Sequence, residues 1–103
     1  MDLLIRIKRL ILRRQYIFTE KAAWEMERDG LTEDMVSESV INAPAISKTI
    51  RSRNPKTGSK EMLHVIIGVT FEGVPIYTKG KISRREGKEV FYVYISSKRS
   101  ESD

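Results

Sequence analysis

Side chains of different type alternate with a period of two over IYTKGKI (residues 76–82) and again over VFYVYIS (residues 90–96). Successive side chains of a β-strand point to opposite faces, so each stretch predicts a strand with two distinct faces. The two stretches are joined by RREG (residues 84–87), across which we expect them to pair. One face of the paired strands is then predicted to carry cations among aromatic rings, from Tyr77, Lys79, Lys81, Tyr92 and Tyr94.

A face of this kind suits single-stranded nucleic acid. Lysines bind backbone phosphates, and the flat faces of aromatic rings stack on bases. Tyrosine and lysine are also ordinary residues on a solvated sheet face. The pattern therefore indicates a nucleic-acid role and leaves the solvated face as its alternative.

Composition limits the other possibilities. The chain has 103 residues, of which 40% are apolar and 32% charged, so we expect one globular domain spanning residues 1–103. It has no cysteine and one histidine, and we therefore expect no dedicated metal centre and no cofactor. No apolar run has the length of a membrane span or of a signal peptide, which predicts a cytoplasmic protein.

Charge is unevenly distributed along the chain. Residues 20–38 contain seven acids and two bases, and since the whole chain carries +5, the remaining residues carry +10. A chain whose acids are confined to one stretch can present a strongly basic surface elsewhere. The expected partner is a polyanion.

Three helices are predicted before residue 44. Apolar residues recur with helical spacing over residues 2–15, and we expect this basic amphipathic helix to pack on its own domain, although such helices also bind membranes or partner proteins. Thr19 is a good N-cap for a second helix that ends at Gly30. Thr32 caps a third, which ends before Pro44.

After residue 45 the period changes to two. The expected strands are residues 46–53, residues 61–70, a third beginning near Pro75 and a fourth following Gly87, with residues 98–103 as a frayed tail. Three helices followed by a four-stranded antiparallel sheet, with the helices packed on one face, is a two-layer α+β plan.

Alternation then assigns the two faces of this sheet. The helices are expected to cover Leu63, Val65, Ile67, Ile76, Ile82, Phe91, Val93 and Ile95. The open face is expected to carry Arg51, Arg53, His64, Tyr77, Lys79, Lys81, Tyr92 and Tyr94. A slip of one residue would invert the first strand, because Lys48 alternates with Ile46 and Ile50.

Short motifs over residues 3–96 resemble a known bacterial family. They are YIFT (residues 16–19), Ala22, Met26, Glu27 and Gly30, the capped helix that follows, and IGVT (residues 67–70) with Gly73 and Pro75. The family is a small domain of unknown function, often encoded beside a zinc-finger antitoxin of the MqsA type, and it is similar in plan to the RelE and MqsR messenger-RNA-cleaving toxins. The resemblance implies a two-layer toxin with a basic catalytic sheet face and a cognate antitoxin as partner.

The chain departs from this family at two positions of its second helix. Lys21 stands where the family usually has a histidine, and Glu25 where it usually has an arginine. A function carried by that histidine in relatives must pass to Lys21 here or be absent.

RNA can be cut without a metal if a base removes the 2′-hydroxyl proton and cations stabilise the charge that develops on the phosphate. The candidate catalytic residues are His64, Tyr77, Lys79 and Lys81, and the candidate RNA-binding residues are Arg51, Arg53, Arg84, Arg85, Tyr92 and Tyr94. His64 is also readily explained as a hydrogen-bonded strand residue between Leu63 and Val65.

Three functions therefore remain open. The first is a metal-independent endoribonuclease toxin acting on messenger RNA. The second is a noncatalytic nucleic-acid-binding module that uses the same face, and the third is a protein-interaction domain that docks through its helices.

Overall fold

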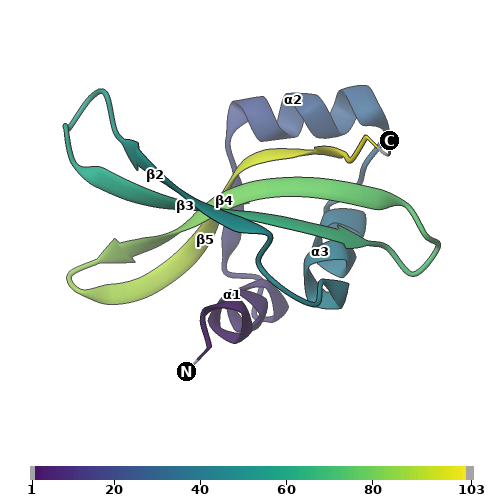
Figure 1. The fold of residues 1–103 in the computed structure, drawn as a ribbon, viewed down its shortest axis with the longest axis horizontal. Coiled ribbons are helices and arrows are strands. Elements are labelled where there is room, and N and C mark those ends of the chain that lie inside the picture. The colour runs from purple at the N-terminus through teal and green to yellow at the C-terminus, as the bar shows by residue number, and fades with distance from the viewer. Residues whose placement is uncertain (1, 102–103) are drawn as a thin grey trace.

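Within residues 2–101, which the computed structural model describes except for the side chain of Val90, the chain forms three helices and five strands (Figure 1). The elements in chain order are α1 (Leu3–Leu12), β1 (Tyr16–Phe18), α2 (Glu20–Asp29), α3 (Glu33–Asn42), β2 (Lys48–Arg53), β3 (Lys60–Val69), β4 (Pro75–Arg85) and β5 (Lys88–Arg99). The α+β class and the three helices before residue 44 are confirmed. β5 includes Lys98 and Arg99, which were expected to fray, while residues 102–103 of that tail lie outside the described residues.

The strands form one mixed sheet in the order β1-β5-β4-β3-β2. The prediction of four antiparallel strands is wrong in one respect: β1 adds a fifth strand, parallel to β5, with Tyr16 opposite Tyr92 and Phe18 opposite Tyr94. Three residues are too few for a detectable period, and the pairing partner lies far along the chain. Arg14, with φ 58°, turns the chain from α1 into β1.

Local capping sets the helix boundaries. The Thr19 hydroxyl accepts a hydrogen bond from the Ala22 N–H at 3.2 Å, and the Thr32 hydroxyl accepts one from the Met35 N–H at 3.1 Å. Gly30 ends α2 in the left-handed conformation, with φ 71°. Both predicted N-caps and the predicted C-terminal glycine are confirmed, because each depends on residues within three or four positions.

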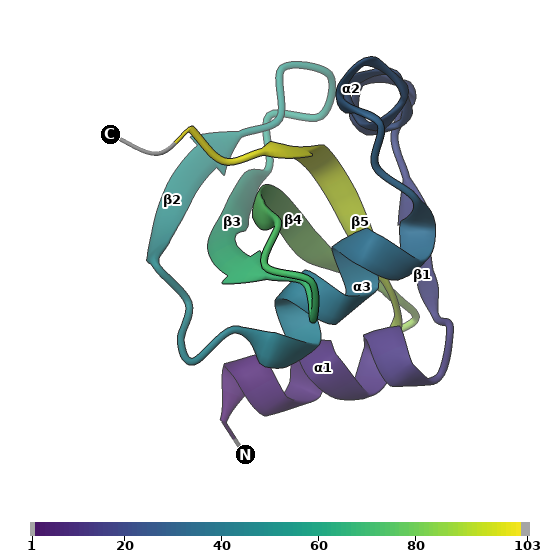
Figure 2. The ribbon, with the colours of Figure 1, turned by 90° about the vertical axis from the view of Figure 1, so that its right-hand side faces the viewer.

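α1 and α3 cover one face of the sheet (Figure 2). The core between these layers contains buried residues from both helices and from the sheet: Leu4, Ile7, Leu10, Ile11, Val36, Val40, Ile66, Ile76, Tyr92 and Tyr94. α3 packs directly on β3 at Gly68, where a Cβ atom would lie 1.8 Å from the backbone oxygen of Ser39.

The predicted faces are correct for β4 and wrong for β2, β3 and β5. Residues directly opposite one another on neighbouring strands share a face. Expected on the open face but found on the helix-covered face are Arg51, Arg53, His64, Tyr92 and Tyr94. Expected beneath the helices but found on the opposite face are Leu63, Val65, Ile67, Phe91 and Val93. The positions of Ile76, Ile82, Tyr77, Lys79 and Lys81 are as predicted.

The errors have a common physical cause. β3 and β5 carry apolar residues on both faces, so alternation alone does not show which set the helices bury. The registers of β4 and β5 also shift twice, between Lys79 and Gly80 and between Ser83 and Arg84. Such irregularities change the phase of the pattern within one strand.

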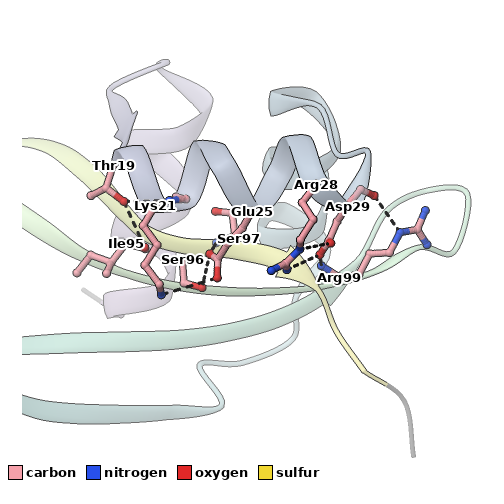
Figure 3. A network of polar contacts seen from close by, with 10 residues as sticks. Thr19, Lys21, Glu25, Arg28, Asp29, Ile95, Ser96, Ser97 and Arg99 are labelled. Atoms are coloured by element: carbon pink, nitrogen blue, oxygen red, sulfur yellow. Dashed lines mark hydrogen bonds and ion pairs between the residues drawn. The ribbon is translucent and has the colours of Figure 1, made fainter.

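The prediction that all three helices pack on one face of the sheet is wrong for α2. This helix lies along the edge of β5, beyond the end of β1 (Figure 3), because its carboxylates bond to the free backbone N–H groups of that strand. The Glu25 carboxylate accepts hydrogen bonds from the Ser97 N–H at 3.1 Å and the Ser96 hydroxyl at 2.7 Å. The Asp29 carboxylate accepts one from the Arg99 N–H at 2.9 Å. Glu25 and Asp29 are four residues apart on the helix, a rise of about 6 Å, and the N–H groups of Ser97 and Arg99 are two residues apart on the strand, a rise of about 6.7 Å. The two spacings are nearly equal, so both carboxylates can bond to the strand at once.

The same contacts shift the pKa values of both carboxyl groups. Burial works to raise the pKa of Glu25, but the hydrogen bonds from Ser96 and Ser97 and the charge of Lys21, 3.7 Å away, together hold it below its ordinary value. Hydrogen bonds from Arg28 and Arg99 lower the pKa of Asp29 to about 2. Lys21 and Glu25, the two positions of α2 at which the sequence departs from the family it resembles, thus belong to the contact that closes this sheet edge.

Glu25→Ala is expected to lower the free energy of unfolding by about 2 kcal/mol, because it leaves the buried Ser96 hydroxyl and Ser97 N–H without an acceptor. Since the folded-state pKa of Glu25 is lowered, its carboxylate stabilises the fold fully above a pH of about 4, and this contribution is lost as the pH falls through the lowered value. Urea denaturation should therefore show a smaller loss of stability on acidification for Glu25→Gln than for the wild type. A wild-type midpoint for Glu25→Ala would contradict this account of the edge.

Candidate nucleic-acid interface

The face of the sheet that points away from α1 and α3 carries four lysines and one half-buried tyrosine. We call this set the basic face, and it consists of Lys48, Tyr77, Lys79, Lys81 and Lys98. Lys48 on β2 lies opposite Val65 on β3, which lies opposite Lys79 on β4, so the two lysines stand in one row across the sheet. Among the described strand residues of this face, Glu61 is the one acid.

Tyr77 lies in the next row, between Ile67 and Lys98. The Lys98 ammonium nitrogen is 5.4 Å from the centre of the Tyr77 ring, a cation–π contact. A groove of about 790 Å³ passes this pair, and its other lining residues include Arg28 and Arg99. Asp29 and Glu101 also line the groove, and Asp29 bonds to both arginines, so Lys98 is the cation that lies directly against the ring. An aromatic ring beside a lysine is an arrangement that can bind a base together with its phosphate.

A second hollow lies where two hairpins separate. The β3–β4 ladder runs from Val69 opposite Pro75 to His64 opposite Gly80, and beyond this pair the β2–β3 and β4–β5 hairpins diverge (Figure 1). The space between them, which we call the hairpin cleft, measures about 820 Å³. Its polar lining residues are Thr49, Ser59, Lys60, Glu61, His64, Lys81, Ser83 and Arg84.

Within the cleft, Lys81 and His64 are held by different contacts. Lys81 Nζ donates to Glu61 Oε1 at 2.8 Å, so its charge is already partly neutralised. His64 is 6% exposed, and its Nδ1 lies 3.1 Å from the Thr49 hydroxyl oxygen. Burial lowers the pKa of His64, so the imidazole is neutral at neutral pH and its protonated form is disfavoured. Of the predicted catalytic residues, His64 and Lys81 both line the cleft, from opposite faces of the sheet, while Tyr77 and Lys79 lie on the basic face.

Tyr92 and Tyr94 are core residues. Both are fully buried, and the Tyr94 ring stacks on Phe18 at 4.6 Å and meets Tyr92 edge to face at 5.2 Å. Burial raises the pKa of both phenols, and the Ser37 hydroxyl opposes the rise at Tyr94. Neither phenol hydroxyl has a hydrogen-bond partner at ordinary bonding geometry among the described residues. Stacking of these two rings on a base is therefore excluded in the folded protein.

The predicted arginines lie at the two hairpin ends. Arg51 and Arg53 lie on β2 and project from the helix-covered face. Arg84 lines the hairpin cleft and is 3.4 Å from Glu89, which also pairs with Arg6. Arg85 is exposed at the β4–β5 turn.

Sequence reasoning missed two lysines of the basic face. Lys98 was assigned to a frayed tail, although the alternation of residues 90–96 continues through it, and its partner across the sheet is Tyr77. Lys48 was placed with the helix-covered side by the chosen phase of the first strand. The sequence did contain a signal for the correct face: Lys48 alternates with Ile46 and Ile50, and a slip of one residue puts Lys48 on the open face.

Among residues 2–101, no three or more metal-binding side chains gather in one place, and no helix is long and apolar enough to cross a membrane. The comparisons with known proteins leave the site to be interpreted from its own geometry: no protein-family model, no curated protein and no solved structure matches this chain.

Proposed function

We propose that this protein binds single-stranded RNA across the basic face. The observation that carries the proposal is that Lys48, Lys79, Lys81 and Lys98 share with Tyr77 the sheet face that α1 and α3 do not cover. A strand of RNA laid across such a face exchanges its condensed counterions for lysines, and this release of counterions supplies affinity without sequence specificity. A base stacked on Tyr77 adds about 1 to 3 kcal/mol.

Lys48 and Lys79 offer the sharpest test because no carboxylate is paired with either in the described residues. For the double variant Lys48→Ala/Lys79→Ala, we expect the slope of log affinity against log salt to become shallower by about 1.4, at about 0.7 for each lost phosphate contact. Fluorescence anisotropy of a labelled oligouridine over a salt series measures this slope.

A matched control removes the same charge elsewhere. Arg13 and Lys56 are exposed and lie off the basic face, at the end of α1 and in the β2–β3 turn. The double variant Arg13→Ala/Lys56→Ala should keep the wild-type slope. Equal slopes for the two double variants would mean that RNA responds to net charge alone, which would overturn the basic face as the binding surface.

A second candidate function is metal-independent RNA cleavage, as the resemblance to RelE and MqsR toxins implies. The hairpin cleft favours it, because a neutral His64 can accept the 2′-hydroxyl proton as that oxygen attacks the phosphorus, and Lys81 can stabilise charge on the phosphate. The bond from phosphorus to the 5′-oxygen then breaks, and solvent water can protonate the departing oxygen. The partner expected for this function is a cognate antitoxin that binds over the lysines of the basic face. The same RNA, incubated with the protein and a chelator, should then yield 2′,3′-cyclic phosphate ends that His64→Ala abolishes without loss of binding, whereas intact RNA would leave the binding module as the function.

A further inference from the structure

The rest of the chain forms hydrogen bonds along one edge of the sheet, at β5, whereas β2 forms the other edge. On the β5 side, the short strand β1 pairs first, and then Glu25 and Asp29 of α2 accept hydrogen bonds from the N–H groups of Ser97 and Arg99. On the other side, β2 is the terminal strand of the sheet (Figure 2). An edge strand presents unpaired N–H and C=O groups to any extended chain that approaches it.

The register identifies the backbone groups that β2 presents. The Asn54 N–H donates to the Ser59 carbonyl at 2.8 Å. This pair continues the β2–β3 register, in which Arg53 lies opposite Lys60, and it is therefore a hydrogen-bonded position. In an antiparallel pair, hydrogen-bonded positions alternate, so Ile50 and Ser52 direct their backbone groups toward β3. Thr49, Arg51 and Arg53 then direct theirs outward.

The charges beside this edge restrict what can pair with it. β2 has the sequence KTIRSR, in which Lys48, Arg51 and Arg53 are exposed and no residue is acidic. A second copy of β2 would place cations opposite cations, which destabilises cross-strand pairing. An acidic strand would place carboxylates opposite them.

We propose that β2 binds an extended acidic segment of a partner protein, which adds to the sheet as a sixth strand beside β2. Main-chain hydrogen bonds to Thr49, Arg51 and Arg53 supply part of the affinity, and the cations select an acidic strand. This interaction uses the backbone edge of β2, and Lys48 is the one residue that it shares with the basic face.

Arg51 makes the proposal testable at a single backbone group. Proline is tolerated on an edge strand where the missing N–H points to solvent. Arg51→Pro therefore removes the outward donor and the charge, whereas Arg51→Ala removes the charge alone. A labelled peptide acetyl-Glu-Val-Glu-Val-Glu-Val-amide, titrated by fluorescence anisotropy, is expected to bind Arg51→Pro about fivefold more weakly than Arg51→Ala, the effect of about 1 kcal/mol for one main-chain hydrogen bond.

The peptide provides a second test that leaves the protein unchanged. N-methylation of alternate residues on its pairing edge should abolish binding to the wild type, and replacement of its glutamates by lysines should do the same. Equal binding to Arg51→Pro and Arg51→Ala, or full binding of the methylated peptide, would overturn strand addition. Loss of peptide binding in Lys48→Ala/Lys79→Ala but not in Arg51→Pro would show that the peptide acts as a polyanion on the basic face. Self-association of the free protein that Arg51→Pro abolishes would make β2 an interface between copies instead.

Discussion

Gly68→Ala is expected to lower the free energy of unfolding by about 3 kcal/mol or more, at the upper end of the cost of overpacking a core. The added Cβ would lie 1.8 Å from the backbone oxygen of Ser39 and 3.3 Å from the Ala43 side chain. Because the obstacle is the backbone of α3, no change of rotamer relieves it, and the helix must move off the sheet. Urea denaturation followed by far-ultraviolet circular dichroism measures the loss.

Gly80 supplies the comparison for this prediction. A Cβ there would lie 2.5 Å from a ring carbon of Tyr92, so the obstacle is a side chain. Gly80→Ala should therefore be partly rescued by Tyr92→Leu, whereas Ser39→Ala should not rescue Gly68→Ala. A Gly68→Ala protein with the wild-type midpoint would show that α3 does not rest on β3 at this position.

Tyr94→Ala is expected to cost about 3 to 5 kcal/mol, the usual range for removing a buried aromatic ring. The ring contacts Tyr16, Phe18 and Tyr92, and it therefore joins β1 to the core. Tyr94→Phe should have an effect within about 0.5 kcal/mol of zero, because the hydroxyl it removes has no hydrogen-bond partner among the described residues.

The same pair of variants separates a core role from a binding role. Tyr94→Phe should bind oligouridine as the wild type does, while Tyr77→Ala should weaken binding, because the Tyr77 ring lies on the basic face. Weaker RNA binding by a stable Tyr94→Phe protein would contradict the assignment of Tyr94 to the core.

The candidate site could be predicted from the sequence only in part. Tyr77, Lys79 and Lys81 share a face as expected, because β4 alternates between small or apolar residues and polar ones. The burial of Tyr92 and Tyr94 was not predictable, because β5 alternates between aromatic and aliphatic residues and either set can be buried. The bulk of a tyrosine ring on the buried face is accommodated by Gly80, a residue of the neighbouring strand.

Local patterns in the sequence were enough to predict the α+β class, the three helices, the four strands that follow them and the ends of α2 and α3, but not β1. These features depend on hydrogen bonds and dihedral preferences within a few residues, such as the caps at Thr19 and Thr32 and the left-handed turn at Gly30. Only the tertiary structure decided which face of the sheet is buried, which edge is closed and which lysines lie together. Those outcomes depend on contacts between distant segments, including Gly68 against α3 and Glu25 against Ser97, and on register shifts that no local pattern reveals.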